Sequence, residues 1–161
     1  MNYLLDTNIV LIYTRESPLT NMIEKKYDLF NSNNKLYLSV VTIAELKSLV
    51  LQRNYGEKKL RLLENLLKNF SIIDINIEEI LDRYAEIDAY SQGKLKKKKG
   101  NFTARNMGKN DLFIAATSSV YDLILITTDK DFDHLSSEFL KLELVDLEEL
   151  KENRTKKNDT E

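Results

Sequence analysis

Four acidic residues occupy positions from which their carboxylates could form one site. Asp6 follows the first apolar run directly and interrupts an otherwise hydrophobic opening. Asp129 follows a later apolar run after two threonines. Glu45 and Asp111 fall in the first turns of two expected helices. Because the carboxyl ends of parallel strands share one edge of a sheet, these four side chains are expected to converge there.

Such a cluster favours metal-dependent chemistry on phosphate esters. Two carboxylates about 4 Å apart repel by roughly 4 kcal/mol at an effective dielectric constant near 20, so they should take up protons or bind a cation. Oxygen ligands suit hard ions such as Mg²⁺ or Mn²⁺. One or two such ions stabilise charge on a phosphoryl group and activate water for attack. The pattern therefore indicates phosphodiester hydrolysis.

Each acid also has a simpler interpretation. A single Asp at a helix start is usually a cap that the helix dipole favours. Thr42 and Glu45 fit a capping box, in which the two side chains satisfy backbone N–H groups at a helix start. Asp131 is an alternative to Asp129 as the fourth acid, although such a residue is more often part of a turn.

Polar neighbours of the acids could orient the metal-binding carboxylates through hydrogen bonds. Thr7 and Asn8 could do this, or they could be ordinary helix caps, and Asn8 is expected to do both. The other residues assigned to this orienting role are Thr128 and Asp131.

A basic segment precedes Asp111 and is expected to contact the phosphate backbone of a nucleic acid. Phosphate contacts by Lys or Arg release counterions and strengthen binding without reading sequence. The alternative is a solvated helix end. The candidate residues are Lys94, Lys96, Lys97, Lys98, Lys99, Arg105 and Lys109.

Apolar runs alternate with helical patterns along the chain, which predicts an α/β fold with a mostly parallel sheet covered on both faces. Strands are expected at 3–5, 36–41, 71–75, 123–126 and 142–145. Helices are expected at 7–14, 57–69, 77–90 and 110–120, after the Ser17-Pro18 start signal, and after a cap at Thr42. Residues 92–108 hold three of the four glycines and are expected to leave a helix end and form a mobile loop.

Composition limits the alternatives. The chain has 161 residues with a net charge of −2, which suits one globular domain, expected at 1–147, followed by a frayed polar tail at 148–161. It has no cysteine and one histidine, so a usual structural zinc site is not expected. Neither a membrane span nor a signal peptide is apparent, and a cytoplasmic location is the expectation.

Four short motifs together resemble the PIN domain family, and more narrowly the VapC group of toxin ribonucleases. They are Asp6-Thr7-Asn8, Thr42 to Leu46, Asn110 to Ala116 and Thr127 to Phe132. The resemblance implies a three-layer α/β/α fold, Mg²⁺- or Mn²⁺-dependent endoribonuclease activity, a homodimer and inhibition by a VapB-type antitoxin. It also implies that Asp6, Glu45, Asp111 and Asp129 are the catalytic and metal-binding acids. The lysine-rich segment is longer and more basic than in many members of the family.

Two other functions fit parts of the pattern. An aspartate-based phosphatase also places an Asp after the first strand, but a second Asp is expected two positions later, where this chain has Asn8. A phospho-acceptor domain would need a Lys directly after a late strand, and Lys130 matches this poorly. A catalytically inactive domain that binds RNA or protein usually lacks one or two acids, whereas all four are present.

Overall fold

A computed structural model describes residues 1–15 and 17–148 of the chain. The tail predicted to be frayed begins at 148, so nearly all of it lies outside the described residues. Along the chain the elements are β1 (Asn2–Leu5), α1 (Thr7–Tyr13), α2 (Pro18–Tyr27), β2 (Lys35–Ser39), α3 (Val40–Gln52), α4 (Glu57–Leu67), β3 (Ser71–Ile73), α5 (Glu78–Ser91), α6 (Lys109–Val120), β4 (Ile124–Thr127), the 3₁₀ helix η1 (Lys130–Leu135) and β5 (Lys141–Leu144).

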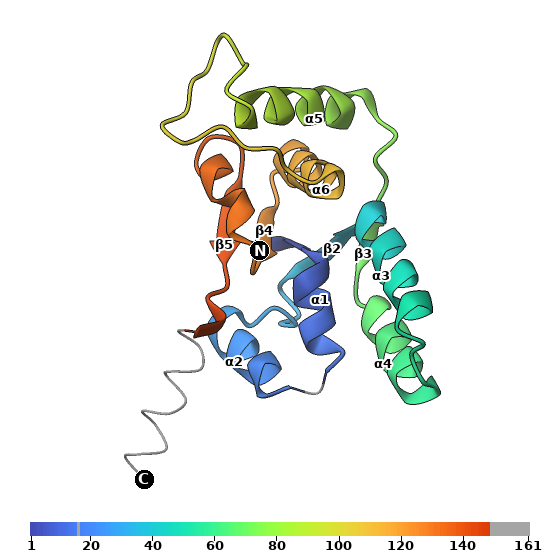
Figure 1. Cartoon of the computed structure of the whole chain (residues 1–161). Helices are drawn as coiled ribbons and strands as arrows, with labels where there is room; N and C mark the ends of the chain where they lie inside the picture. The colour runs from blue at the N-terminus through green and yellow to red at the C-terminus, as the bar shows by residue number, and fades with distance from the viewer. Residues whose placement is uncertain (16, 149–161) are drawn as a thin grey trace.

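The strands form one sheet in the order β3-β2-β1-β4-β5, and every neighbouring pair is parallel. Strand β1 lies at the centre, where Tyr3 pairs with Leu36 of β2 and with Ile124 of β4. All the strands therefore end at the same edge of the sheet, as the alternating pattern predicts. Loops and helix starts that follow β1, β2 and β4 meet at that edge (Figure 1).

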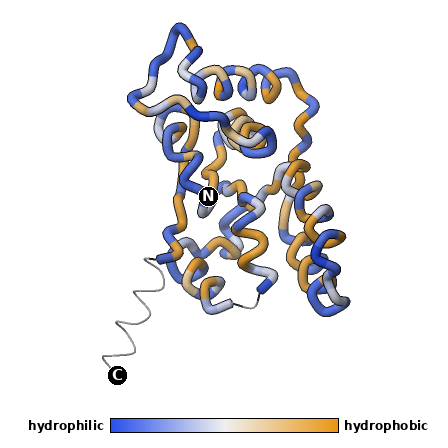
Figure 2. Tube along the Cα trace, in the orientation of Figure 1, coloured by the Kyte–Doolittle hydropathy of each residue, from blue (hydrophilic) through white to orange (hydrophobic). Residues whose placement is uncertain are grey.

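Helices cover both faces of the sheet, which confirms the predicted three layers. Leu4 and Leu5 are both fully buried but belong to different hydrophobic clusters, because successive side chains of a strand point to opposite faces. The cluster around Leu5 includes Ile9 of α1, and the cluster around Leu4 includes Ile114 of α6. Helices α3, α4 and α5 carry alternating apolar and polar bands, as expected for helices with one face against the core (Figure 2).

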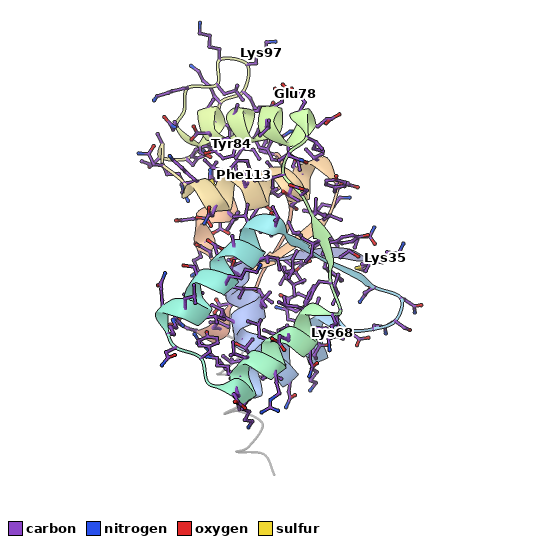
Figure 3. All side chains as sticks on the ribbon, turned by 90° about the vertical axis from the view of Figure 1, so that its right-hand side faces the viewer. Lys35, Lys68, Glu78, Tyr84, Lys97 and Phe113 are labelled. Carbon is purple, nitrogen blue, oxygen red and sulfur yellow. The ribbon has the colours of Figure 1, made fainter. Side chains whose placement is uncertain are left out.

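Helix α5 packs against α6 through an aromatic pair. The rings of Tyr84 and Phe113 lie 4.5 Å apart, centroid to centroid, between the two helices (Figure 3). The predicted loop is present: α5 ends at Ser91, and residues 92–108 form neither helix nor strand. Lysines 96–99 therefore do not form a solvated helix end, and Lys97 projects near the outermost part of this loop (Figure 3).

One helix boundary was predicted three residues too late. Ser39, not Thr42, is the N-cap of α3, and its Oγ accepts a hydrogen bond of 3.3 Å from the backbone N–H of Val41. Strand β2 consequently ends at Ser39, and Thr42 is buried inside the helix. The capping box does not form, and Glu45 lies in the second turn of α3. Two smaller differences are that β3 ends at Ile73 rather than at 75 and β5 begins at Lys141.

No helix in residues 1–15 or 17–148 is both long enough and apolar enough to cross a membrane.

Candidate active site

Asp6 is held at the junction of β1 and α1 by bonds from three directions. Its backbone N–H continues the strand ladder to the carbonyl of Ile126, at 3.0 Å. Its Oδ1 caps α1 by accepting from the backbone N–H of Thr7, at 2.6 Å. Its Oδ2 accepts from the hydroxyl of Thr127, at 2.7 Å. The side chain is therefore buried and oriented before any ligand binds, with only 4% of the residue exposed.

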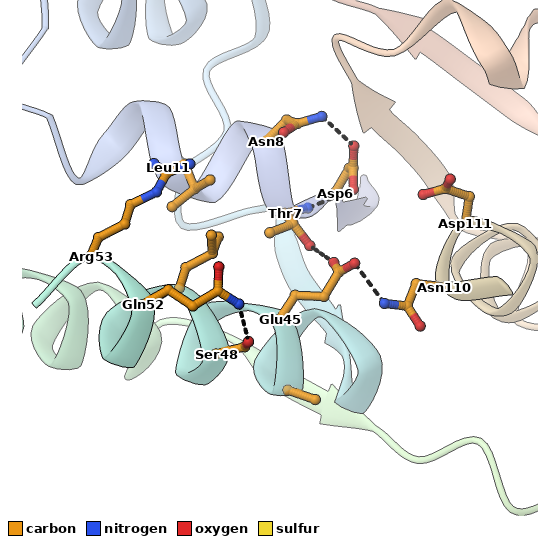
Figure 4. Close-up of a pocket in the computed structure, with 12 residues that line it drawn as sticks. Asp6, Thr7, Asn8, Leu11, Glu45, Ser48, Gln52, Arg53, Asn110 and Asp111 are labelled. Carbon is orange, nitrogen blue, oxygen red and sulfur yellow. Dashed lines mark hydrogen bonds between the residues drawn. The ribbon is translucent and has the colours of Figure 1, made fainter. Parts of the chain in front are cut away.

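Asp111 faces Asp6 from the first turn of α6, as the sequence predicts (Figure 4). The N-cap of that helix is Gly108, and a Cβ atom at Gly108 would lie only 2.6 Å from Oδ2 of Asp111. Real Cβ atoms essentially never approach another heavy atom this closely. The missing side chain at Gly108 is therefore what leaves room for the Asp111 carboxylate.

Glu45 connects α3 to the helices on either side of the site. One of its carboxylate oxygens accepts a hydrogen bond from the hydroxyl of Thr7, and the other accepts from the side-chain amide of Asn110 at 2.8 Å (Figure 4). The expected role of Thr7 as an orienting residue is thus matched by a contact, and the carboxylate that it orients is that of Glu45. Asn110 was not assigned a role from the sequence, although it directly precedes Asp111.

Asp129 directly precedes η1 and lies two residues after the end of β4. Its Oδ1 accepts from the backbone N–H of Asp131 at 2.8 Å, so Asp129 acts as the N-cap of this short helix. Its own N–H donates to Thr127 Oγ1 at 3.0 Å. Asp131 is exposed. The Asp129 charge raises the pKa of both Asp6 and Asp111, whereas the Asp131 charge raises that of Asp111 but not that of Asp6, which favours Asp129 as the fourth acid.

Two of the expected orienting contacts differ from the prediction. The hydroxyl that contacts Asp6 belongs to Thr127 and not to Thr128. Thr127 is the last residue of β4, and Thr128 already lies beyond the strand. Asn8 does not cap α1, because Asp6 itself is the N-cap. Its amide lies 3.5 Å from Asp6 Oδ2, at the outer limit of a hydrogen bond.

Burial and the charges of neighbouring acids make Asp6 and Asp111 weaker acids than an ordinary aspartate. Burial raises the pKa of Asp6 from 3.8 to about 6; the hydrogen bonds from Thr127 and Thr7 oppose the rise, and the charges of Glu45 and Asp129 add to it. The pKa of Asp111 is also raised to about 6, first by burial and then by the charges of Asp6, Asp129, Glu45 and Asp131. The charged forms of both groups are therefore unfavourable without a cation.

The carboxylates surround a common space but do not enclose an ion as they stand. In the part of the chain that the structure describes, no three acidic side chains are grouped closely enough to hold a metal. The donor set still fits a hard divalent cation, because oxygen ligands with raised pKa values gain from a neighbouring positive charge.

A pocket of about 520 Å³ opens in front of three of the four acids, and Asp129 is not among the residues that line it. Asp6, Glu45 and Asp111 line it at one end, and it continues along α1 and α3 as far as Arg53 (Figure 4). None of the described residues assigned to RNA binding from the sequence lines this pocket. Arg53, which was not assigned any role, is the basic residue that does.

The lysine-rich loop instead packs against the end of α5 and the segment between η1 and β5. Lys98 Nζ lies 2.7 Å from a carboxylate oxygen of Glu138 and 4.5 Å from the ring centroid of Phe139. Phe102, from the same loop, lies against Tyr90 with ring centroids 5.1 Å apart. The loop is therefore anchored to the end of α5 and to the segment between η1 and β5. Lys109 begins α6 and directly precedes Asn110.

Comparison with known proteins gives a consistent result. Residues 3–138 match the PIN domain. A protein of Haemophilus influenzae described as ribonuclease VapC2 is 29% identical over 139 residues, which cover 84% of this chain and 92% of that protein. Among solved structures, VapBC2 from Rickettsia felis bound to a DNA fragment from their promoter superposes with a TM-score of 0.72 and 26% identity, covering 91% of this chain and 100% of the other. VapBC-1 from nontypeable Haemophilus influenzae superposes with a TM-score of 0.68 and 27% identity. The match covers 89% of this chain and 98% of the other.

Proposed function

The chain belongs to the PIN domain family, and on that basis we propose that it is a Mg²⁺- or Mn²⁺-dependent endoribonuclease, the toxin of a toxin–antitoxin pair. The observation that carries the proposal is the convergence of Asp6 and Asp111. These two carboxyls come from elements about a hundred residues apart, they face each other in one pocket, and both have a pKa of about 6. A soluble domain gains nothing in stability from such a pair, so a cation-binding role explains it better.

Asp6 and Asp111 would hold the cation, with Glu45 and Asp129 beside them. When bound, a Mg²⁺ or Mn²⁺ ion supplies charge stabilisation at the phosphoryl group and lowers the pKa of a water molecule. Thr127 and the backbone of Thr7 fix the orientation of Asp6, so little reorganisation is needed there. Glu45 already accepts hydrogen bonds from Thr7 and Asn110, which would hold its carboxylate in place beside them.

The partners proposed for this chain follow from its similarity to VapC proteins. One similar protein is described as a ribonuclease, and two similar structures are described as VapBC. We therefore propose RNA as the substrate, a VapB-type antitoxin as the inhibitor and a homodimer as the assembly. A catalytically inactive RNA- or protein-binding domain is the alternative, and an aspartate-based phosphatase is a more distant one.

Cleavage of a defined RNA tests the proposal directly. The purified chain is incubated with a fluorescent RNA that carries no phosphate monoester, in Mg²⁺, in Mn²⁺ and in excess EDTA. We expect cleavage only with a metal. Asp111→Asn should lower the rate at least about a hundredfold, because several kcal/mol of charge stabilisation depend on the ion.

A matched carboxylate provides the control. Asp122 lies at the opposite edge of the sheet, where its Oδ2 pairs with Lys141 at 2.6 Å. Asp122→Asn should cleave at the wild-type rate. Cleavage that continues in EDTA, or an Asp111→Asn variant as fast as wild type with an unchanged circular dichroism spectrum, would contradict the proposal. Absence of cleavage together with retained RNA binding would favour the inactive binding domain.

A further inference from the structure

The pocket at the acids has a basic far end. Arg53 is the C-cap of α3, is exposed, and lines the same pocket as Asp6 and Asp111. Among the described residues that line this pocket, Arg53 is the basic one. In Figure 4 its side chain extends from the end of α3 toward Leu11 of α1, at the opposite end of the pocket from Asp111.

Arg53 lies too far from the acids to neutralise them. Eight residues separate it from Glu45 along α3, which is roughly 12 Å at 1.5 Å per residue. A polar surface joins the two: Ser48 and Gln52 line the pocket between them, and the Gln52 amide donates to the Ser48 hydroxyl at 2.8 Å. The acids would repel an anionic strand, whereas this surface and the guanidinium beyond it would attract one.

In the described part of the chain, the Arg53 guanidinium has no structural role. No ion pair or side-chain hydrogen bond joins Arg53 to a described residue, whereas Arg61 on α4 pairs with Glu57 at 2.8 Å. A second pocket is also lined mainly by basic charge. Its lining includes Thr14, at the end of α1, the exposed Arg15 and the half-buried Lys59, together with the acidic Glu57.

We propose that Arg53 binds a backbone phosphate of the RNA strand, away from the phosphodiester bond that is cleaved. The strand would leave the acidic end of the pocket and run along α3 as far as Arg53. This inference rests on the proposed ribonuclease function and adds to it the path of the substrate. A guanidinium suits this task because its planar set of N–H donors can make two parallel bonds to one phosphate.

The proposal predicts an effect on binding with little effect on chemistry. Arg53→Gln should raise KM for a short single-stranded RNA about tenfold, since one charge-assisted contact is lost, and should leave kcat within about twofold. The slope of log KM against log salt should become shallower by about 0.7, the value for one phosphate contact on a single strand. Arg53→Lys should recover part of the affinity.

Two controls separate this effect from general loss of charge. Arg61→Gln removes the same charge from an exposed position outside the pocket, and it should leave KM and kcat unchanged. A set of substrates, each with one neutral methylphosphonate in place of a phosphate, should identify a single position that raises KM in wild type but not in Arg53→Gln.

The outcomes distinguish the two proposals. If wild type cleaves RNA and Asp111→Asn does not, yet Arg53→Gln keeps the wild-type KM and salt slope, the phosphate site is wrong and the ribonuclease function stands. An equal effect of Arg61→Gln, or a fall in kcat without a rise in KM, would also overturn the phosphate site. If wild type cleaves no RNA with either metal, the proposed function fails and the phosphate site fails with it.

Discussion

The hydroxyl of Thr127 donates a 2.7 Å hydrogen bond to Oδ2 of Asp6, and this bond joins the ends of the two central strands β4 and β1. Both residues are buried, with Thr127 fully so. The same hydroxyl oxygen accepts the backbone N–H of Asp129 at 3.0 Å. One threonine therefore fixes the position of the most buried acid and the path of the chain toward the fourth acid.

Removing this hydroxyl should lower the stability of the fold and raise the pKa of Asp6. Thr127→Val leaves a buried carboxylate oxygen without its partner, which should lower the free energy of unfolding by about 1–3 kcal/mol. The pKa of Asp6 should rise further above 6, because the lost bond lowers that pKa. Urea denaturation and a pH–rate profile shifted to higher pH would report the two effects. Thr127→Ser keeps the hydroxyl and should resemble wild type; equal effects of Val and Ser would show that the bond is unimportant.

Stability in the absence of metal should fall as pH rises. The folded pKa values of Asp6 and Asp111 are about 6, against 3.8 for an ordinary aspartate. Between these values the folded chain binds more protons than the unfolded chain, so the free energy of unfolding decreases as pH increases through this window. Asp111→Asn should make the free energy of unfolding depend less steeply on pH. This variant should also be more stable than wild type at pH 7.5 in EDTA.

Urea denaturation from pH 4 to 7.5 measures this, and the difference between wild type and variant removes the contributions of other groups. Asp122→Asn, which changes an exposed carboxylate, should follow wild type. Parallel curves for wild type and Asp111→Asn would mean that the facing carboxylates do not destabilise the folded chain.

Divalent metal should reverse this instability. A ligand that binds only the folded state stabilises it by about 2.7 kcal/mol at a hundredfold excess over Kd, which is roughly 5–10 °C in Tm. The shift with Mg²⁺ or Mn²⁺ should be larger at pH 7.5 than at pH 5, since protons compete for the same oxygens. It should be much smaller in Asp6→Asn. A Tm that millimolar Mg²⁺ and Mn²⁺ leave unchanged would count against a metal site.

Much of this site could be predicted from local sequence, because its acids lie at strand ends and helix starts that periodicity reveals. Asp6, Asp111 and Asp129 are found where those signals place them. The errors arise where two similar residues compete. Ser39 and Thr42 are both plausible caps, and only the length of β2 decides between them.

The contacts that could not be predicted from the sequence are tertiary contacts. Asn110 contacts Glu45 from a helix 65 residues away, and Arg53 shares a pocket with Asp6 although nothing in its local sequence marks it. The lysine-rich segment is easily recognised in the sequence, but its composition does not predict which part of the fold it packs against. Its position beside Glu138 and Phe139 depends on how η1 and β5 pack.

Gly108 should be required for the position of Asp111. Gly108→Ala places a Cβ 2.6 Å from Oδ2 of Asp111, so the carboxylate must move. A displacement near 1 Å can cost about a hundredfold in rate, so we expect cleavage to fall ten- to a hundredfold while the chain stays folded. Gly56→Ala is the matched comparison, because Gly56 is also a glycine N-cap and has no atom within 4 Å of its Cβ position. Unfolding measurements on both variants would show the cost of losing glycine at a helix start, and wild-type cleavage by Gly108→Ala would contradict the prediction.

The lysine-rich loop should contribute to RNA affinity without contributing to catalysis. Lys98 is kept in this test because its ion pair with Glu138 gives it a structural role. Changing Lys96, Lys97 and Lys99 to Gln should weaken binding of long RNAs and make the dependence of log affinity on log salt shallower, because fewer counterions are released.

The loss should be similar for unrelated RNA sequences, because phosphate contacts carry no sequence information. It should be small for RNAs short enough to lie within the pocket, since these lysines do not line it. Cleavage at saturating RNA should persist. The matched control changes Lys25, Lys35 and Lys68, three exposed lysines on other parts of the surface, to Gln. If both triple variants flatten the salt dependence equally, net charge alone explains the effect; if neither does, the loop lysines are ordinary solvated side chains and the strand does not pass them.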